Sequence, residues 1–329
     1  MKYLLLTTGP GYFPELMRDV ERAGLYNWRK AYNGEVRFWQ DVKNRPTDLL
    51  DYDIIHVNLA GEDMGLATKV RPLIEGSRVK LIVNMDYAIN YFSSSLEKAG
   101  SDPLALQKDL QSADMVFGVE PTQVSLLTYF LTILKRPPAK LIPHPIDTEM
   151  MYREFFVDYD RRLDIMAYQY HRYDDMWEIP RMLMQDLPPY HERPVLTSCL
   201  GFMRDEFKRL IMPDIIMPYR DWQTYMQLLK ACRWGFEYRM HYAASRFILE
   251  CASIGIPVVS TNFSYMGRLL FPDLTFHPGD FDSIRKCMQN LILNEELYRK
   301  QAKRGIESVE MFNLENSRKR MEDALKNAV

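Results

Sequence analysis

One stretch of the chain, residues 245–261, changes its hydrophobic period in the middle, and this change restricts the possible folds most strongly. In "SRFILECASIGIPVVST" the apolar side chains first recur three and four residues apart, as on one face of a helix that runs to Ile254. Gly255 suits the left-handed residue that ends a helix, and Pro257 cannot continue one. The closing "IPVVST" is a β-branched run typical of a buried strand. The stretch therefore predicts a helix that leads directly into a strand, which is half of an α/β unit.

The same alternation of strand-like and helical segments extends along the whole chain. The first half contains the strand-like runs "YLLLTT", "EVRFW", "YDIIHVNLA", "KLIVNMD", "ADMVFGVE" and "AKLIPHPID". After residues 149–162, which show no clear period, the second half continues with "LDIMAYQY", "RPVLTSCL", "DIIMPY", "WGFEYRM" and "LTFHPGD". This order is typical of parallel sheets wound with helices, so we expect an α/β protein with two Rossmann-like domains. We place the domains at residues 1–160 and 161–310, followed by a terminal helix over 311–329.

Composition excludes several classes of protein. The 329 residues are 47% hydrophobic, which supplies the cores of two domains without covalent cross-links. Lys and Arg number 42 against 44 Asp and Glu, so the net charge of −2 gives no overall attraction to nucleic acid or to an acidic membrane. The four cysteines form no CxxC pair, and no stretch is as long as a transmembrane helix. We expect a cytoplasmic protein, and a peripheral position on a membrane stays open.

The carboxyl ends of the predicted strands are where we look for chemistry, because open parallel sheets bind their ligands there. A helix that begins after Ser245 would add N–H donors and a positive dipole end, which suit a phosphate. The polar and glycine residues near these ends include Gly9 and Gly11, Asp86, Arg172, Arg239, His241 and Tyr242. Together they predict a site with one wall in each domain.

Four segments resemble a known family. The order "LIPHPIDTEM", "MQLLKACRWGFEYRM", "RFILECASIGIPVVST" and "FHPGDFDSIRKCMQNLILNEELYRKQAKRGIESVEMFNLE" is similar to the carboxyl half of GT-B glycosyltransferases, especially the family 4 retaining group. That family reads IPNGVD, an E-x7-E segment leading into G-x-PVV, a PGD segment and a closing helix. The match covers the chain from Leu141 onward, and the first half matches in rhythm only. The resemblance implies two domains that face each other across a cleft, with the last helix crossing back to the first domain.

The resemblance also implies a function and the residues for it. Glu250 matches the family's second glutamate, which holds the ribose hydroxyls of a nucleotide-sugar donor. The expected activity is transfer of a hexose to an acceptor hydroxyl with retention of configuration and without a metal ion or other cofactor. By the same resemblance and position, we assign Asp86 and His241 to catalysis, Ser245, Arg246, Tyr242, Arg172 and Arg239 to the donor, and Gly9 and Gly11 to a loop near the sugar.

The sequence departs from the family pattern at three places. Tyr242 stands eight residues before Glu250, where the family has a glutamate. "NFSYMG" replaces the GG-x-PE loop, and "YQYHRYDDMW" replaces the Gly-Arg…Lys segment that binds the donor phosphate. These departures bear on the identity of the donor sugar and on activity itself.

Other interpretations stay open. Tyr242 also fits a catalytically silent sugar-nucleotide-binding protein, and Glu250 with Arg246 also fits a solvated i, i+4 pair. An NAD-dependent oxidoreductase is disfavoured because Pro10 and Pro14 interrupt the glycine pattern of the first turn. The "DYD" of residues 51–53 resembles a DxD metal motif but precedes its strand, at the wrong edge of the sheet, so we expect no metal there. The acceptor could be a glycan, a lipid-linked sugar, a small molecule or a modified base.

Overall fold

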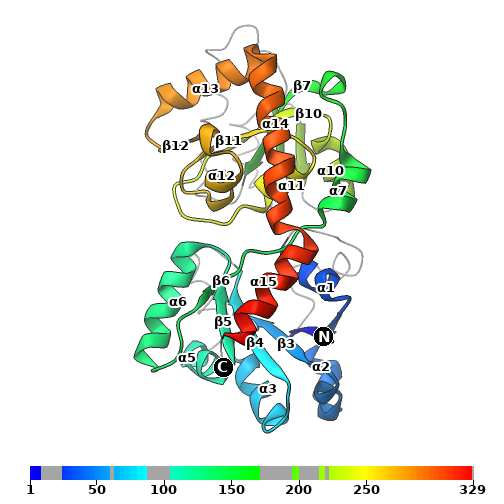
Figure 1. Ribbon diagram of the computed structural model, residues 1–329, viewed down its shortest axis with the longest axis vertical. Coiled ribbons are helices and arrows are strands. Elements are labelled where there is room, and N and C mark those ends of the chain that lie inside the picture. Colours follow the sequence, from blue (N-terminus) through cyan, green and yellow to red (C-terminus); the bar gives the residue numbers. More distant parts are fainter. Residues whose placement is uncertain are drawn as a thin grey trace. The chain divides into compact units, whose positions relative to one another are not determined.

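The computed structural model describes residues 1–8, 24–59, 63–86, 104–170, 195–199, 215–218 and 222–327. They form two compact units (Figure 1). Unit 1 comprises Met1–Ile146 and Phe312–Val329, and unit 2 comprises Asp147–Met311. Residues 147–160, which the sequence analysis assigns to the first domain, belong by their contacts to unit 2, because α7 (Thr148–Phe155) packs against α11 (Arg246–Ser253).

Unit 1 is built on a six-stranded sheet in which all strand pairs are parallel, in the order β2-β1-β3-β4-β5-β6. The strands are β1 (Tyr3–Thr7), β2 (Glu35–Phe38), β3 (Ile54–Asn58), β4 (Lys80–Met85), β5 (Met115–Gly118) and β6 (Lys140–Leu141). Around them lie α1 (Asn27–Tyr32), α2 (Trp39–Val42), the 3-10 helix η1 (Pro46–Asp51), α3 (Leu66–Ile74), α5 (Ala105–Ser112) and α6 (Pro121–Ile133). The strands β1 and β4 are mostly apolar and almost entirely buried, as expected for a sheet covered on both faces.

Unit 2 repeats this plan with a different strand order, β12-β11-β10-β7-β8-β9, again with parallel pairs only. The strands are β7 (Leu163–Tyr170), β8 (Val195–Cys199), β9 (Ile215–Pro218), β10 (Cys232–Glu237), β11 (Val258–Thr261) and β12 (Thr275–Phe276). The other helices are η4 (Tyr159–Arg161), α10 (Trp222–Leu229), α12 (Tyr265–Leu270), η6 (Pro272–Leu274), α13 (Phe281–Leu293) and α14 (Glu295–Val309). Gly255 has φ of 72° after α11, so the predicted left-handed helix end is confirmed.

The last helix returns to unit 1, as the resemblance implied. After η7 (Glu310–Phe312), α15 (Leu314–Lys326) packs beside α1, as Figure 1 shows for the red and blue helices. The backbone N–H of Ile146 donates to the carbonyl of Phe312 at 2.9 Å. On α15 itself, Ser317 and Met321 are buried. The prediction of two Rossmann-like α/β domains with a C-terminal helix on the first is therefore confirmed.

A buried polar chain runs across the sheet of unit 1. The hydroxyl of Tyr3 lies 2.5 Å from Nδ1 of His56, and His56 Nε2 lies 2.8 Å from Oδ1 of Asn84. Burial lowers the pKa of His56 from 6.5 to about 3, while its hydrogen bond with Asn84 acts in the opposite direction. His56 is therefore neutral, and the chain reads as Tyr3 donating to Nδ1 and Nε2 donating to Asn84.

We expect Met321→Ala to destabilise unit 1. Met321 is fully buried, and truncation of such a side chain costs about 2–5 kcal/mol because a cavity remains. Chemical unfolding followed by a probe in each unit should show an earlier transition in unit 1 only. Lys319→Ala, an exposed position on the same helix, is the control and should change stability by less than about 0.5 kcal/mol. Equal effects of the two substitutions would contradict the packing of α15.

The buried histidine also predicts how stability depends on pH. Since the pKa of His56 is lower in the folded state than its ordinary value of 6.5, its contribution is fully present above that value and is lost as the pH falls toward about 3. Relative to His56→Gln, the native protein should lose about 1.4 kcal/mol per pH unit across this window. The measurement is urea unfolding at several pH values, in which slopes are compared because the substitution also alters packing. Parallel curves for the two proteins would show that His56 is not held neutral.

Candidate functional site

The strand order of unit 2 places a topological switch point between β7 and β10. The chain builds outward from β7 through β8 and β9, then returns to β10 on the other side. Ligands of open α/β sheets bind beyond the carboxyl ends of the strands at such a point. Glu237 is the last residue of β10, so its side chain stands at this edge. Arg172, which follows β7, lies outside the described residues.

Glu237 is a buried carboxylate that organises the loop after β10. Its Oε1 accepts hydrogen bonds from Nη2 of Arg239 at 2.8 Å and from the hydroxyl of Ser245 at 2.6 Å. Glu237 is 0% exposed and Arg239 is 3% exposed, so both charges are withdrawn from solvent. The second oxygen, Oε2, is buried and has no hydrogen-bond partner among the described residues. A carboxylate oxygen left in this state is an acceptor that a ligand donor can use.

Ser245 links that carboxylate to the start of α11. Its backbone has φ of 61° and ψ of 98°, a conformation that costs a residue with a side chain about 1–3 kcal/mol. Its hydroxyl donates to Glu237 and accepts from the N–H of Ile248 at 3.3 Å, which caps the helix. The two hydrogen bonds hold the serine in its strained conformation and fix where the positive end of α11 lies.

The loop after β10 is also fastened to the loop after β11. The hydroxyl of Thr261 donates to the carbonyl of Arg239 at 2.8 Å and accepts from the Arg239 N–H at 3.0 Å. The backbone of Ala243 makes two hydrogen bonds to the neighbouring loop. Its N–H donates to the carbonyl of Phe263 at 3.1 Å, and its carbonyl accepts from the N–H of Tyr265 at 2.9 Å. Hydrogen bonds of main-chain groups therefore hold together the two loops at the carboxyl edge of β10 and β11.

Glu250 lies one turn further along α11 and is 2% exposed. Its Oε1 accepts a hydrogen bond from the indole N–H of Trp222, the first residue of α10, at 3.0 Å. Trp222 packs edge-on against Phe155 of α7 with ring centroids 5.6 Å apart. Glu250 is buried, whereas Arg246, four residues before it on the same helix, is exposed.

The rim of this edge is aromatic and cationic. Tyr242 is 41% exposed and meets the ring of Phe263 edge-on, with centroids 4.7 Å apart. The guanidinium of Arg268 lies 5.9 Å from the Tyr242 ring, within the range of a cation–π contact. His241 is half-buried beside it. The position that the family fills with a glutamate thus presents a phenol.

A second polar cluster lies at the carboxyl edge of the sheet in unit 1. Asp86 directly follows β4, and its Oδ1 lies 2.7 Å from Nε2 of His144, which follows β6. The indole N–H of Trp28 on α1 donates to Nδ1 of the same histidine at 3.1 Å. Gly9 and Gly11, which the sequence analysis assigns to this edge, lie outside the described residues.

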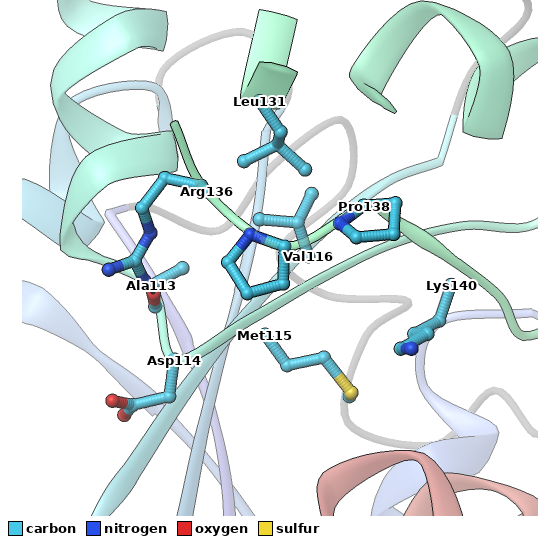
Figure 2. A pocket seen from close by; sticks show the side chains of 9 residues that line it. Ala113, Asp114, Met115, Val116, Leu131, Arg136, Pro138 and Lys140 are labelled. Carbon is cyan, nitrogen blue, oxygen red and sulfur yellow. Dashed lines mark hydrogen bonds between the residues drawn. The ribbon is translucent and has the colours of Figure 1, made fainter. Parts of the chain in front are cut away.

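A small pocket elsewhere in unit 1 is not a site candidate. It lies at the amino ends of β5 and β6, the opposite edge of the sheet (Figure 2). Two of its charged side chains have partners within the protein, because Arg136 donates to the carbonyl of Ala113 and Asp114 pairs with Arg71 at 2.8 Å. The lining residues are Ala113, Asp114, Met115, Val116, Leu131, Arg136, Pro137, Pro138 and Lys140.

The two buried cysteines of β10 and α11 do not supply a nucleophile to the candidate site of unit 2. Cys251 lies next to Glu250 on α11, and burial together with that carboxylate raises the pKa of its thiol well above the ordinary value. Burial likewise raises the pKa of Cys232 to about 12. Both thiols are protonated near neutral pH and therefore are not nucleophiles.

The structure brings some predicted residues together and adds two that the sequence analysis missed. Arg239, His241, Tyr242, Ser245, Arg246 and Glu250 lie on the β10 loop and α11 of unit 2, whereas Asp86 lies in unit 1. Glu237 and Trp222 were not predicted. A signal existed for Glu237, since "WGFEY" places one acidic residue inside an apolar strand. No pattern marks Trp222, which meets Glu250 only through tertiary packing.

Comparisons with known proteins find the fold only. No family model and no curated protein sequence matches the chain. Within the described residues no helix is long and apolar enough to cross a membrane.

Solved structures match over nearly the whole chain. A structure of Anabaena Alr3699/HepE in complex with UDP-glucose is similar with a TM-score of 0.69 and 14% identity, covering 99% of this chain and 100% of that one. An alpha-glucosyltransferase in complex with UDP-glucose and DNA containing an abasic site gives 0.70 and 12%, covering 99% of each chain. A structure described as trehalose-6-phosphate from E. coli, bound with UDP-2-fluoro glucose, gives 0.66 and 10%, covering 100% of each. The chain therefore has the GT-B glycosyltransferase fold.

Proposed function

We propose that the protein is a glycosyltransferase that moves a sugar from a nucleotide-sugar donor to an acceptor hydroxyl. The observation that supports this most directly is the buried carboxylate of Glu250 on the helix that begins at the switch point of unit 2. Structures of the same fold were solved with UDP-glucose or its fluoro analogue, which makes UDP-glucose the first donor to test.

In this proposal Glu250 holds the ribose of the donor. A carboxylate accepts hydrogen bonds from the two ribose hydroxyls, and such charge-assisted bonds are stronger than neutral ones. Trp222 donates to one oxygen of Glu250 and thereby fixes the orientation of the carboxylate. Arg246 and the N-terminus of α11 serve the diphosphate, with Arg172 assigned to the same group by resemblance. Arg239 acts on the donor through the loop, because its guanidinium is directed to Glu237.

The chemistry follows the resemblance to the family 4 group. Transfer proceeds with retention of configuration, and an oxygen of the donor phosphate takes the proton of the acceptor hydroxyl. Asp86, His241 and the Gly9 to Gly11 turn contact the reacting sugars. The acceptor is a glycan, a lipid-linked sugar, a small molecule or a modified base.

A second candidate is a sugar-nucleotide-binding protein without transferase activity. Tyr242 favours it, because a phenol held against Phe263 replaces an expected carboxylate. Assays of donor hydrolysis and of sugar transfer to a panel of acceptors distinguish the two: a protein that binds UDP-glucose but neither hydrolyses nor transfers it is the silent binder.

We expect Glu250→Gln to weaken UDP binding by tenfold or more. The amide keeps an oxygen that can accept from Trp222 but removes the charge, which is worth about 1.5–3 kcal/mol in hydrogen bonds to the nucleotide. Calorimetric titration with UDP measures the effect, and thermal unfolding checks that the variant folds. Trp222→Phe, which leaves the carboxylate in place, should weaken binding less. An unchanged dissociation constant for Glu250→Gln removes Glu250 from the donor site.

Transfer or donor hydrolysis should survive chelation of divalent cations. In the proposed site the leaving diphosphate is neutralised by basic side chains and by the N-terminus of α11. Rates measured before and after dialysis against EDTA should agree. The "DYD" aspartates offer no substitute at this edge, because Asp53 precedes β3 and accepts from the backbone N–H of Lys2 at 2.7 Å. Loss of turnover that manganese restores would refute this prediction.

A further inference from the structure

Asp86, His144 and Trp28 form a directed hydrogen-bond chain in unit 1. An indole N–H can only donate, so Nδ1 of His144 must accept from Trp28 and carries no proton. The proton of the neutral imidazole is then on Nε2, which donates to Oδ1 of Asp86 at 2.7 Å. The direction of the chain is therefore fixed from Trp28 through His144 to Asp86.

The histidine at the centre of this chain is held rigidly. His144 is 4% exposed, and Trp28 is 0% exposed with its ring edge-on against Phe117. The carbonyl of Pro145 accepts from the side-chain amide of Asn27 at 3.2 Å, and the next residue donates to the carbonyl of Phe312. The segment that carries His144 is thus tied to α1 on one side and to the start of the C-terminal helix on the other.

Two other acidic residues described at this edge accept hydrogen bonds from the protein itself. Glu120 is 0% exposed and caps α6 by accepting from the N–H groups of Thr122 and Gln123. Asp63 accepts from the hydroxyls of Thr7 and Thr8 and so joins the end of β1 to the loop after β3. The side chain of Asp86 is 14% exposed and reaches the surface, whereas that of His144 is only 4% exposed.

We propose that Asp86 accepts a hydrogen bond from a substrate hydroxyl and that His144 and Trp28 are the positioning residues that orient its carboxylate. This inference rests on the proposed glycosyl transfer and names residues that the sequence analysis did not assign to it. His144 does not itself receive a substrate proton, since both ring nitrogens are occupied, one by Trp28 and one by Asp86. Among the described residues, His56 of β3 is a titratable group near Asp86; burial keeps it neutral, so it does not compete for the carboxylate.

The test compares variants that keep or remove the N–H next to Asp86. In His144→Phe the ring remains but the N–H donor to Asp86 is lost, so kcat should fall more than tenfold. Because the carboxylate of Asp86 loses that hydrogen bond, it is protonated more easily, and the acid side of the plot of kcat against pH should move up by about one pH unit. His144→Gln places an amide N–H near the former Nε2. It should retain most of the activity, and the acid side of its kcat–pH profile should stay where it is in the native protein. Trp28→Phe frees Nδ1, so the imidazole can take either tautomer, and its kcat should lie between the two.

Controls separate positioning from loss of structure. Tyr52→Phe removes a hydroxyl that donates to Glu35 at 2.7 Å at the amino edge of the same sheet, and it should leave kcat unchanged. UDP affinity, which is assigned to unit 2, should be the same in all these variants. Equal loss of activity in His144→Phe and His144→Gln, or an unmoved acid limb in His144→Phe, overturns the proposal.

A readout without turnover keeps this inference distinct from the proposed function. If the native protein neither transfers nor hydrolyses any nucleotide sugar tested, the proposed function fails. NMR then tests the hydrogen bonds from Trp28 through His144 to Asp86 without any turnover. Nitrogen shifts should show His144 protonated on Nε2 only. The carboxyl carbon of Asp86 should titrate at a higher pH in His144→Phe than in the native protein. The opposite tautomer, or an unchanged titration, overturns the proposal.

Discussion

The buried charge of Glu237 is the constraint on which the candidate donor edge depends. A carboxylate withdrawn from water is costly unless a counter-charge and hydrogen bonds compensate it. Arg239 and Ser245 supply these within one loop, and both approach the same oxygen. Because Ser245 also caps α11, the position of that helix and the strained backbone at its start follow from the need to satisfy one carboxylate. Glu250 then lies one helical turn beyond the start of α11, on its buried side.

In unit 1 the buried polar side chains are compensated by hydrogen bonds to neutral imidazoles and not by an ion pair. Each of the two histidines accepts a hydrogen bond at Nδ1 and donates one from Nε2. His56 accepts from Tyr3 and donates to Asn84. His144 accepts from Trp28 and donates to Asp86. A neutral ring that donates and accepts once carries no net charge to desolvate, and its tautomer is set by the fixed donor behind it. The two hydrogen-bond chains end at Asn84 near the carboxyl end of β4 and at Asp86 just after it, at the edge where ligands of parallel sheets bind.

The departure from the family pattern at Tyr242 falls where the backbone, rather than a side chain, holds the loop. Tyr242 is exposed, while its neighbour Ala243 pairs with Phe263 and Tyr265 through main-chain groups. Such pairing does not depend on the side chain at position 242, so a phenol can replace a carboxylate without moving the loop. This is consistent with a shared fold over nearly the whole chain at only 10–14% identity.

What the sequence alone determined is the fold class, because hydrophobic period, glycine and proline are local properties. The run from Ser245 to Thr261 specified its helix, its left-handed end at Gly255 and its strand, and the final helical pattern specified α15. The sequence also marked Glu250 and Asp86 by their places relative to helix and strand. It could not reveal which side chains would meet them. Trp222 lies 28 residues from Glu250, and His144 lies 58 residues from Asp86. Only the parallel winding of the two sheets brings those residues together, because hydrogen bonds between distant segments depend on strand order and helix packing, which no local pattern encodes.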